Sequence, residues 1–215
     1  MIDTLNIVGA FWTIQGEGFH SGRRALFVRM PYCNLKCSWC DTEFNTYKTV
    51  SESDFIKLAI SEKARFAVIT GGEPMMNRHT PRVIAILKGL GFEIACESNG
   101  TFSILPGIDF ATVSPKKFSE LAHQPRQPVG NGMGRYPAYY VHDQAMKAAH
   151  EFKYVVDDEF DFSILDRHEA SDGRRYSLSP EFNDFDVNVG KIIRFIEKNP
   201  GWRISLQTHK WMKVP

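Results

Sequence analysis

Three of the four cysteines lie in one eight-residue segment, with a spacing suited to metal chemistry. Cys33, Cys37 and Cys40 form the pattern C-x3-C-x2-C directly after a strand predicted over residues 25–30. Three thiolates can hold a cubane iron–sulfur cluster and leave its fourth iron open to another ligand. A zinc knuckle and unligated core thiols are the alternatives, but structural zinc usually has four protein ligands and the segment carries polar residues. The spacing therefore favours an iron–sulfur cluster.

A glycine-rich turn follows a second predicted strand, over residues 66–69. It reads Thr70-Gly71-Gly72-Glu73-Pro74 and lies at the carboxyl end of its strand, where α/β proteins place ligands. The glycines let a ligand approach the backbone, and the Glu73 carboxylate can accept hydrogen bonds from an ammonium group. Gly and Pro also mark ordinary strand-to-helix turns. About thirty residues after the cysteine segment, the turn indicates a ligand site. Cys96, in an apolar strand, is expected to be only a packed thiol.

The cysteine spacing, with an aromatic residue before the last cysteine, and the Gly-Gly-Glu-Pro turn resemble the radical S-adenosylmethionine (SAM) superfamily. The resemblance implies a [4Fe-4S] cluster on Cys33, Cys37 and Cys40, whose open iron is chelated by the amino and carboxylate groups of SAM. The reduced cluster passes an electron to SAM, and the resulting 5′-deoxyadenosyl radical takes a hydrogen atom from the substrate. The residues that the resemblance assigns to SAM here are Trp39, Cys40, Asp41, Gly72 and Glu73.

Further motifs occur in order along the chain and narrow the resemblance. They are Thr13-Ile14-Gln15-Gly16-Glu17-Gly18, Arg29, Cys40-Asp41-Thr42, Glu97-Ser98-Asn99-Gly100-Thr101, Ser114-Pro115-Lys116 and Gln207-Thr208-His209-Lys210. Together they resemble the 7-carboxy-7-deazaguanine synthase family, from about residue 11 to the C-terminus and weakly over 117–151. The resemblance implies a radical ring contraction of 6-carboxy-5,6,7,8-tetrahydropterin to 7-carboxy-7-deazaguanine, with loss of ammonia, in the biosynthesis of queuosine and related deazapurines. It also implies that SAM is regenerated and that Mg²⁺ is used.

The same resemblance assigns roles to individual residues. Arg29 offers a planar fork for the substrate carboxylate. Thr42 supplies a hard oxygen for Mg²⁺, although a threonine there is otherwise most often a helix cap. The remaining substrate contacts are expected from Ile14, Gln15, Gly16, Thr70, His209 and Pro215, and the remaining SAM contacts from Ser114, Pro115 and Lys116. For Ser114 to Lys116 the alternative is a turn with an exposed lysine, and for His209 a structural or solvated side chain.

The chain end is a special case, because termini usually fray. Trp211, Met212 and Val214 are apolar enough to pack, and Pro215 restricts the backbone. The pterin presents an edge of N–H donors that needs an anionic or carbonyl acceptor. We therefore expect the α-carboxylate of Pro215 to fold into the active site and accept hydrogen bonds from that edge.

These residues must be positioned by an alternation of strands and helices. Strands are predicted over residues 25–30, 66–70, 92–96, 110–113, 152–156, 176–178 and 203–206. Several are near-continuous apolar runs, which is typical of strands covered on both faces. Helical stripes run over residues 83–90 and 189–196, and Ser51 or Ser53 can cap a helix through residues 55–60.

The alternation predicts an α/β fold with mostly parallel strands. At 215 residues the chain is shorter than the roughly 250 of a full eight-unit barrel, so an incomplete barrel or an open sheet fits better. Of the two, we expect the incomplete TIM-like barrel. A single domain is expected over residues 1–215. A loop over residues 123–137, rich in Pro, Gly and Arg, is a candidate lid.

Composition excludes several other classes of protein. A net charge of +1 gives no electrostatic excess for nucleic acid or an anionic membrane, and no apolar run is long enough to span a bilayer. The N-terminus lacks the features of a secretion signal, so a cytoplasmic protein is expected. The family resemblance also implies that the protein is a homodimer and that a flavodoxin-type protein reduces it. The rival hypotheses are a glycyl-radical-enzyme activase and a non-catalytic zinc or iron–sulfur module.

The cluster assignment predicts different consequences for the four thiols. Replacing Cys33, Cys37 or Cys40 by Ala should abolish both cluster and turnover, because each supplies one iron ligand. Cys96→Ala, the matched control, should keep both. Iron content after anaerobic purification measures the outcome, and a full cluster in Cys37→Ala would contradict the assignment.

Overall fold

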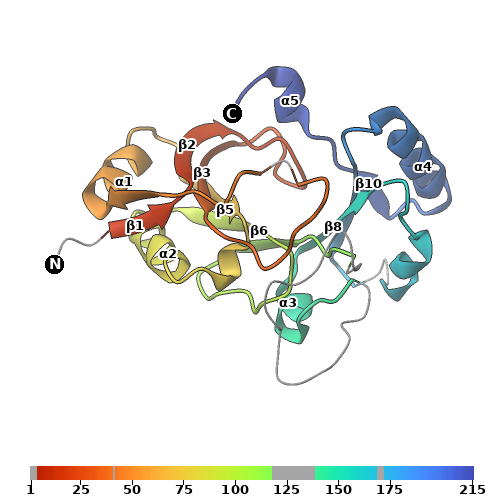
Figure 1. Ribbon diagram of the computed structural model, residues 1–215, viewed down its shortest axis with the longest axis horizontal. Coiled ribbons are helices and arrows are strands. Elements are labelled where there is room, and N and C mark those ends of the chain that lie inside the picture. The colour runs from red at the N-terminus through yellow and green to blue at the C-terminus, as the bar shows by residue number, and fades with distance from the viewer. Residues whose placement is uncertain (1–3, 41, 118–138, 169–171) are drawn as a thin grey trace.

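One curved sheet of mostly parallel strands organises the molecule (Figure 1). The computed structural model describes residues 4–40, 42–117, 139–168 and 172–215. Within them, the main sheet has eight strands in the order β10-β9-β8-β7-β6-β5-β3-β2, and a two-stranded ribbon joins β1 and β4. All neighbours in the main sheet are parallel except β2 and β3. Because β2 and β10 are both edges, the barrel stays open, which confirms the predicted incomplete barrel.

The bounds of the elements follow the chain. The strands are β1 (Thr4–Ile7), β2 (Gly9–Ile14), β3 (Arg24–Met30), β4 (Lys48–Ser51), β5 (Phe66–Gly71), β6 (Glu93–Ser98), β7 (Phe110–Val113), β8 (Glu151–Val156), β9 (Arg175–Pro180) and β10 (Trp202–Ile204). The helices are α1 (Glu52–Ala59), α2 (Thr80–Gly89), α3 (Asp143–Ala148), α4 (Phe185–Lys198) and α5 (Thr208–Met212), with 3₁₀ turns at Pro74–Met76 and Phe162–Arg167. Each of the seven predicted strands is present, whereas β1, β2 and β4 were not predicted.

Local chemistry explains where the predicted helices begin and end. The Ser51 hydroxyl accepts a hydrogen bond from the Asp54 amide and caps α1, which settles the choice between Ser51 and Ser53. Helix α2 is followed by Gly91 at φ +77°, and the Phe92 amide then bonds back to the Leu87 carbonyl. Only a residue that tolerates positive φ allows this ending easily.

The two faces of the main sheet differ in chemistry, and the apolar runs of the sequence did not reveal this difference. The outer face is apolar and packs against the helices, in clusters that include Leu26, Ile69, Phe152 and Tyr176. The inner face is polar on β6, which carries Glu97, and on β8, where Glu151 and Lys153 occupy alternate positions. Because successive side chains of a strand point to opposite faces, the apolar core lies outside the sheet and the polar side chains lie inside the barrel.

The amino-terminal end of the barrel interior is filled and closed. A small inner cluster is made by Ala25, Phe66, Val68, Ala95 and Phe110. The rings of Phe19 and His20, from the loop between β2 and β3, pack on Phe110, and His20 also contacts Phe66. Open space inside the barrel is therefore left toward the carboxyl ends of the strands.

Two expectations fall outside what the structure describes. The predicted loop over residues 123–137 and Asp41 both lie outside the described residues. Among the described helices, none combines the length with the apolar composition needed to cross a bilayer.

Candidate active site

The barrel holds a cavity of about 650 Å³, and it gathers nearly all the residues that the sequence predicted for the site. The predicted residues that line it are Ile14, Gln15, Gly16, Arg29, Cys33, Cys37, Trp39, Cys40, Thr42, Thr70, Gly72, Ser114, Lys116, His209 and Pro215. Glu73 and Pro115 are not part of the lining. The cavity therefore brings together segments from both ends of the chain and from its middle.

The cysteine segment forms one wall, fixed by the end of β5. The Gly72 amide donates to the Met30 carbonyl at 2.9 Å, and the Glu73 amide donates to the Tyr32 carbonyl at 2.8 Å. A Cβ atom at Gly72 would lie 1.8 Å from that Tyr32 oxygen, so the contact requires glycine. Tyr32 itself has φ +68°, an uncommon conformation for a bulky residue, directly before Cys33.

The three thiols of this wall suit a soft metal centre. Cys33 and Cys37 are partly buried, Cys40 is exposed, and all three are free. Burial raises the pKa of Cys33 to about 12 and that of Cys37 to about 11, so a metal must displace their protons to bind. The Leu35 amide donates to the Cys33 sulfur at 3.4 Å. In the described ranges no three His, Cys, Asp or Glu side chains are gathered as a metal site.

Glu73 braces this wall from behind and is not part of the cavity lining, so its expected contact with the SAM ammonium stays a prediction. The carboxylate is fully buried and accepts from the Asn99 amide (2.7 Å), the Met75 amide (3.0 Å) and the Ser98 hydroxyl (2.8 Å). Asn99 in turn donates to the Asn34 side chain at 3.0 Å. Glu73 thus links the turn after β5 to the end of β6 and, through Asn99, to the cysteine segment.

Ser114 and Lys116 form a second contact point near the thiols. The Lys116 ammonium donates to the Ser114 carbonyl at 2.8 Å and also to its hydroxyl, and it lies 5.4 Å from the centre of the Trp39 ring. Burial lowers the pKa of Lys116. The lysine is therefore folded over the turn and faces the cavity, unlike the exposed lysine of the alternative interpretation.

Arg29 projects into the cavity from the penultimate position of β3. Its guanidinium lies 5.1 Å from the centre of the Phe11 ring. Among the described residues, no carboxylate forms a salt bridge with it. A positive planar group with unpaired donors at a cavity wall is a binding point for an anion.

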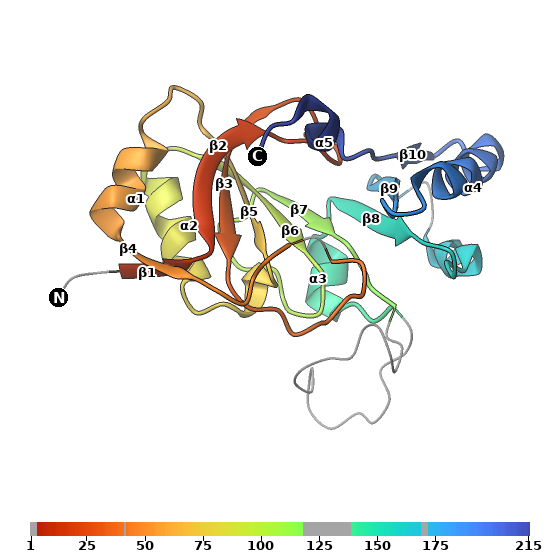
Figure 2. The same ribbon diagram turned by 45° about the horizontal axis from the view of Figure 1, so that its top comes forward.

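The chain end closes the open side of the barrel against the loop that follows β2. Figure 2 shows α5 and the C-terminus beside β2. The Thr208 amide and hydroxyl both donate to the Gly16 carbonyl at 3.0 Å, and the Thr13 hydroxyl donates to the Pro215 carboxylate at 2.8 Å. A Cβ atom at Gly16 would lie 2.2 Å from the His209 ring nitrogen. Pro215 therefore lies at the cavity wall, and the expected role of its carboxylate toward a substrate stays a prediction.

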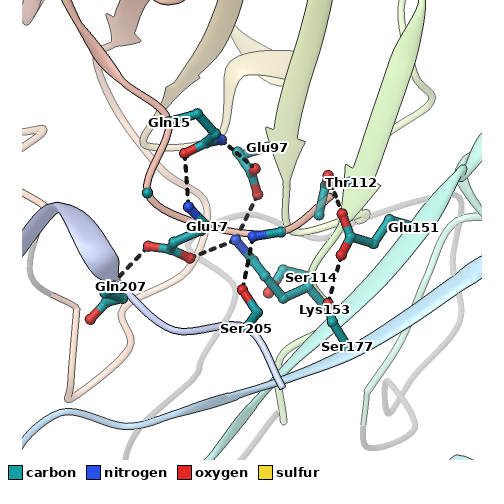
Figure 3. A network of polar contacts seen from close by, with 12 residues as sticks. Gln15, Glu17, Glu97, Thr112, Ser114, Glu151, Lys153, Ser177, Ser205 and Gln207 are labelled. Atoms are coloured by element: carbon teal, nitrogen blue, oxygen red, sulfur yellow. Dashed lines mark hydrogen bonds and ion pairs between the residues drawn. The ribbon is translucent and has the colours of Figure 1, made fainter. Parts of the chain in front are cut away.

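Two carboxylates share one ammonium group at the cavity lining (Figure 3). Lys153 donates to Glu17 at 2.7 Å and to Glu97 at 2.9 Å, and we call these three residues the carboxylate–lysine cluster. Gln207 donates to the other oxygen of Glu17 at 2.9 Å, which ties the C-terminal segment to the cluster. Burial opposes the charge on Lys153, but the carboxylates raise its pKa, so it remains an ammonium ion.

This cluster was not predicted from the sequence. Glu17, Glu97 and Gln207 are members of motifs to which no such contact was assigned, and Lys153 lies within a mostly apolar predicted strand. The alternation of residues along this strand could have revealed Lys153. One face of the strand carries Glu151, Lys153 and Val155, and the other carries Phe152, Tyr154 and Val156. A charged residue on the inner face of a barrel strand is a candidate site residue.

Comparisons with known proteins agree with this geometry. The model of the radical SAM superfamily matches residues 27–154. The 7-carboxy-7-deazaguanine synthase of Neisseria meningitidis serogroup B is 32% identical over 97% of this chain and 93% of the relative. That of Synechocystis sp. is 31% identical, with 97% and 92% coverage.

Solved structures show the same fold. The crystal structure of QueE from Escherichia coli aligns with a TM-score of 0.72 and 25% identity, over 94% of this chain and 93% of that chain. SuiB from Streptococcus suis, bound to its precursor peptide SuiA, aligns with a TM-score of 0.55 at 12% identity, over 83% of this chain and 47% of that chain. At that identity the likeness to SuiB concerns the fold alone.

The shared ammonium predicts a strong effect of Lys153→Met. Two buried carboxylates would lose their counter-charge, and breaking a buried ion pair costs about 3–5 kcal/mol of folding free energy. In the parent the pKa of Glu17 is lowered to about 2, because Lys153 outweighs the opposing effect of burial. Without Lys153 the effect of burial is opposed only by the weaker effects of Gln207 and His209, so that pKa rises. The variant should therefore lose most stability at neutral pH and less as the pH falls toward 5.

Chemical denaturation over this pH range measures the effect. Lys57→Met, which removes an exposed ion pair with Asp54, is the matched control and should lose little at any pH. A Lys153→Met protein as stable as this control at pH 7 would contradict the assignment.

Proposed function

Since the chain belongs to the radical SAM superfamily and to its 7-carboxy-7-deazaguanine synthase family, we propose which of its residues carry out that family's reaction. The protein is a radical SAM enzyme that converts 6-carboxy-5,6,7,8-tetrahydropterin to 7-carboxy-7-deazaguanine with loss of ammonia. One observation carries the assignment of its site. A single cavity is lined by three free thiols, an arginine without a carboxylate partner among the described residues, and the terminal carboxylate.

The cofactor end of the cavity is the cysteine wall. We propose that Cys33, Cys37 and Cys40 hold the [4Fe-4S] cluster, which supplies the electron that generates the 5′-deoxyadenosyl radical from SAM. Trp39, Gly72, Ser114 and Lys116 line the same region and are proposed to hold SAM. Gly72 leaves room for close approach to the backbone, and Glu73 supports the wall from behind.

The substrate end lies between Arg29 and the chain terminus. We propose that the Arg29 guanidinium binds the pterin carboxylate and that the Pro215 carboxylate accepts from the donor edge of the ring. Ile14, Gln15, Gly16, Thr70 and His209 complete the proposed contacts. The opposite charges of Arg29 and the Pro215 carboxylate within this region would orient a flat substrate that carries an anion at one end and N–H donors at the other.

Further proposals follow from the family and from the chain. Thr42 lines the cavity beside Cys40, which supports its proposed role as a Mg²⁺ ligand. The continuous main sheet supports one domain over the chain. A cytoplasmic location is proposed because thiols persist in a reducing compartment. A homodimer and a flavodoxin-type reductant are proposed from the family alone.

The function is tested by turnover of the reconstituted, reduced protein. With SAM and 6-carboxytetrahydropterin it should form the deazaguanine chromophore and release ammonia, and it should contain about four irons per chain. Mg²⁺ should raise the rate of the parent and of Thr46→Ala, an exposed threonine of the same loop, but should have a weaker effect on Thr42→Ala at equal iron content. A fully loaded protein without turnover would favour the activase hypothesis, and a zinc-loaded one the binding module.

The terminal carboxylate is tested by blocking it. A charge-assisted hydrogen bond is worth about 1.5–3 kcal/mol, or one to two powers of ten in affinity, so deleting Pro215 or adding a C-terminal tag should raise the Michaelis constant for the pterin accordingly. SAM binding should be unchanged, and an N-terminal tag is the matched control. Identical constants for the two tagged enzymes would show that the terminus does not contact the substrate.

A further inference from the structure

The carboxylate–lysine cluster has one more negative group than it has positive ones. Glu17 comes from the loop after β2, Glu97 from β6 and Lys153 from β8, and all three line the cavity. Both carboxylates are held by the same ammonium group. Because two carboxylates in a site of low dielectric cannot both be balanced by one ammonium, the cluster is expected to keep one proton.

The hydrogen bonds decide which carboxylate carries that proton. Glu17 accepts from Lys153 and also from Gln207 at 2.9 Å, and both bonds favour its ionised form. Glu97 accepts from Lys153, but the one partner of its other oxygen among the described residues is the Gln15 side chain, at 3.4 Å. The proton therefore resides on Glu97, the less well compensated of the two.

The charges around Glu97 act in the same direction. Burial and the negative charges of Glu17 and Glu151 raise the pKa of Glu97 to about 7, against the lowering effect of Lys153. Lys116, from the turn after β7, is a more distant positive neighbour, engaged with Ser114. Glu151, on β8, is itself held by Ser177 at 2.7 Å. At neutral pH, Glu97 is thus able both to release and to accept a proton.

We propose that Glu97 is the acid–base catalytic residue of the ammonia-releasing step and that Lys153 is its positioning residue. The proposal rests on the proposed function. In this step the carbon–nitrogen bond of the ring-contracted substrate breaks and its electron pair goes to nitrogen, which takes the proton of Glu97 and leaves as ammonia. The neighbouring carbon then loses a proton to the Glu97 carboxylate, and its C–H electron pair forms the new double bond. The carboxyl group is restored, and the elimination itself involves no net oxidation or reduction.

Neighbouring groups are less suited to this transfer. Glu17, with its pKa lowered to about 2, carries no proton to give at neutral pH. The Pro215 carboxylate is a terminal group that accepts from Thr13, and the proposed function uses it to bind the substrate edge. Lys153 keeps its proton because both carboxylates stabilise its charge.

The variant Glu97→Gln tests the proposal, because glutamine has the shape and charge of the protonated carboxyl but cannot transfer the proton. Folding, iron content and SAM binding should be kept, and the Michaelis constant should change little. Turnover to ammonia and deazaguanine should fall by about 10²-fold or more, the usual contribution of a general acid–base group. With substrate deuterated at the carbon that bears the carboxylate, deuterium should still pass into the adenosyl group, because that transfer precedes ammonia loss.

A matched variant and the pH profile give a second readout. In the parent, kcat should fall as the pH rises above the pKa of Glu97, because the acid form is then lost. Glu17→Gln removes a negative neighbour and lowers that pKa, so its fall in kcat should begin about one pH unit lower or more. If Glu97→Gln fails to load iron, the shift in the pH dependence of kcat in Glu17→Gln tests the proton role of Glu97 instead.

Three outcomes would overturn the proposal. They are a parent-like kcat in Glu97→Gln, a defect confined to the Michaelis constant, and a loss of deuterium transfer despite intact cluster and SAM binding. An unchanged pH profile in Glu17→Gln would also contradict it. Absence of both deuterium transfer and ammonia release in the loaded parent would instead overturn the proposed function, and the proton role with it.

Discussion

The ammonium group of Lys153 is the constraint on which the site depends. A buried charge is tolerated only when it is paired, and this one is paired with carboxylates from two separate segments. Through Glu17 the pairing reaches Gln207, so the first and last parts of the chain are held together inside the barrel. The segments that carry the proposed substrate contacts are therefore positioned by the same ion pairs that stabilise the polar interior.

An open barrel also needs other devices to enclose a reaction. The rings of Phe19 and His20 and a small apolar layer fill the amino-terminal end, whereas α5 covers the side next to β2. Gly72 allows the Tyr32 backbone, and Gly16 the His209 side chain, to approach where a Cβ atom would collide. The remaining space is about 650 Å³, large enough for a substrate and cofactor to be held side by side.

Much of this arrangement could be predicted from the sequence, because its motifs mark ligand-binding segments directly. The cysteine spacing, Arg29 and the terminal Pro215 were predicted residue by residue, and all line the cavity. The parallel strands were found from their apolar runs. Strands β1, β2 and β4 were missed because they pair in antiparallel fashion and are interrupted by polar residues or flanked by glycine.

Other parts of the site depend on contacts between distant segments, which no local pattern reports. The Glu73 carboxylate accepts from three donors of the fold, and the sequence motif around it does not predict these contacts. Lys153 was not predicted because its partners, Glu17 and Glu97, come from distant segments that meet it only in the folded sheet. The register that sets Glu97 beside Thr112, and Thr112 beside Glu151, is a property of the sheet.

The most direct test of this account is hydrogen exchange at the two chain segments that the cluster joins. The Gly18 amide donates to the Ser205 hydroxyl, and the Thr208 amide donates to the Gly16 carbonyl. Both bonds join the segment around Glu17 to the C-terminal segment. In Glu17→Gln both amides should exchange faster together, by about tenfold for each 1.4 kcal/mol of lost coupling, while the amides of β5 and β6 keep their protection. Unchanged protection of both segments would show that the buried ion pairs do not hold the site together.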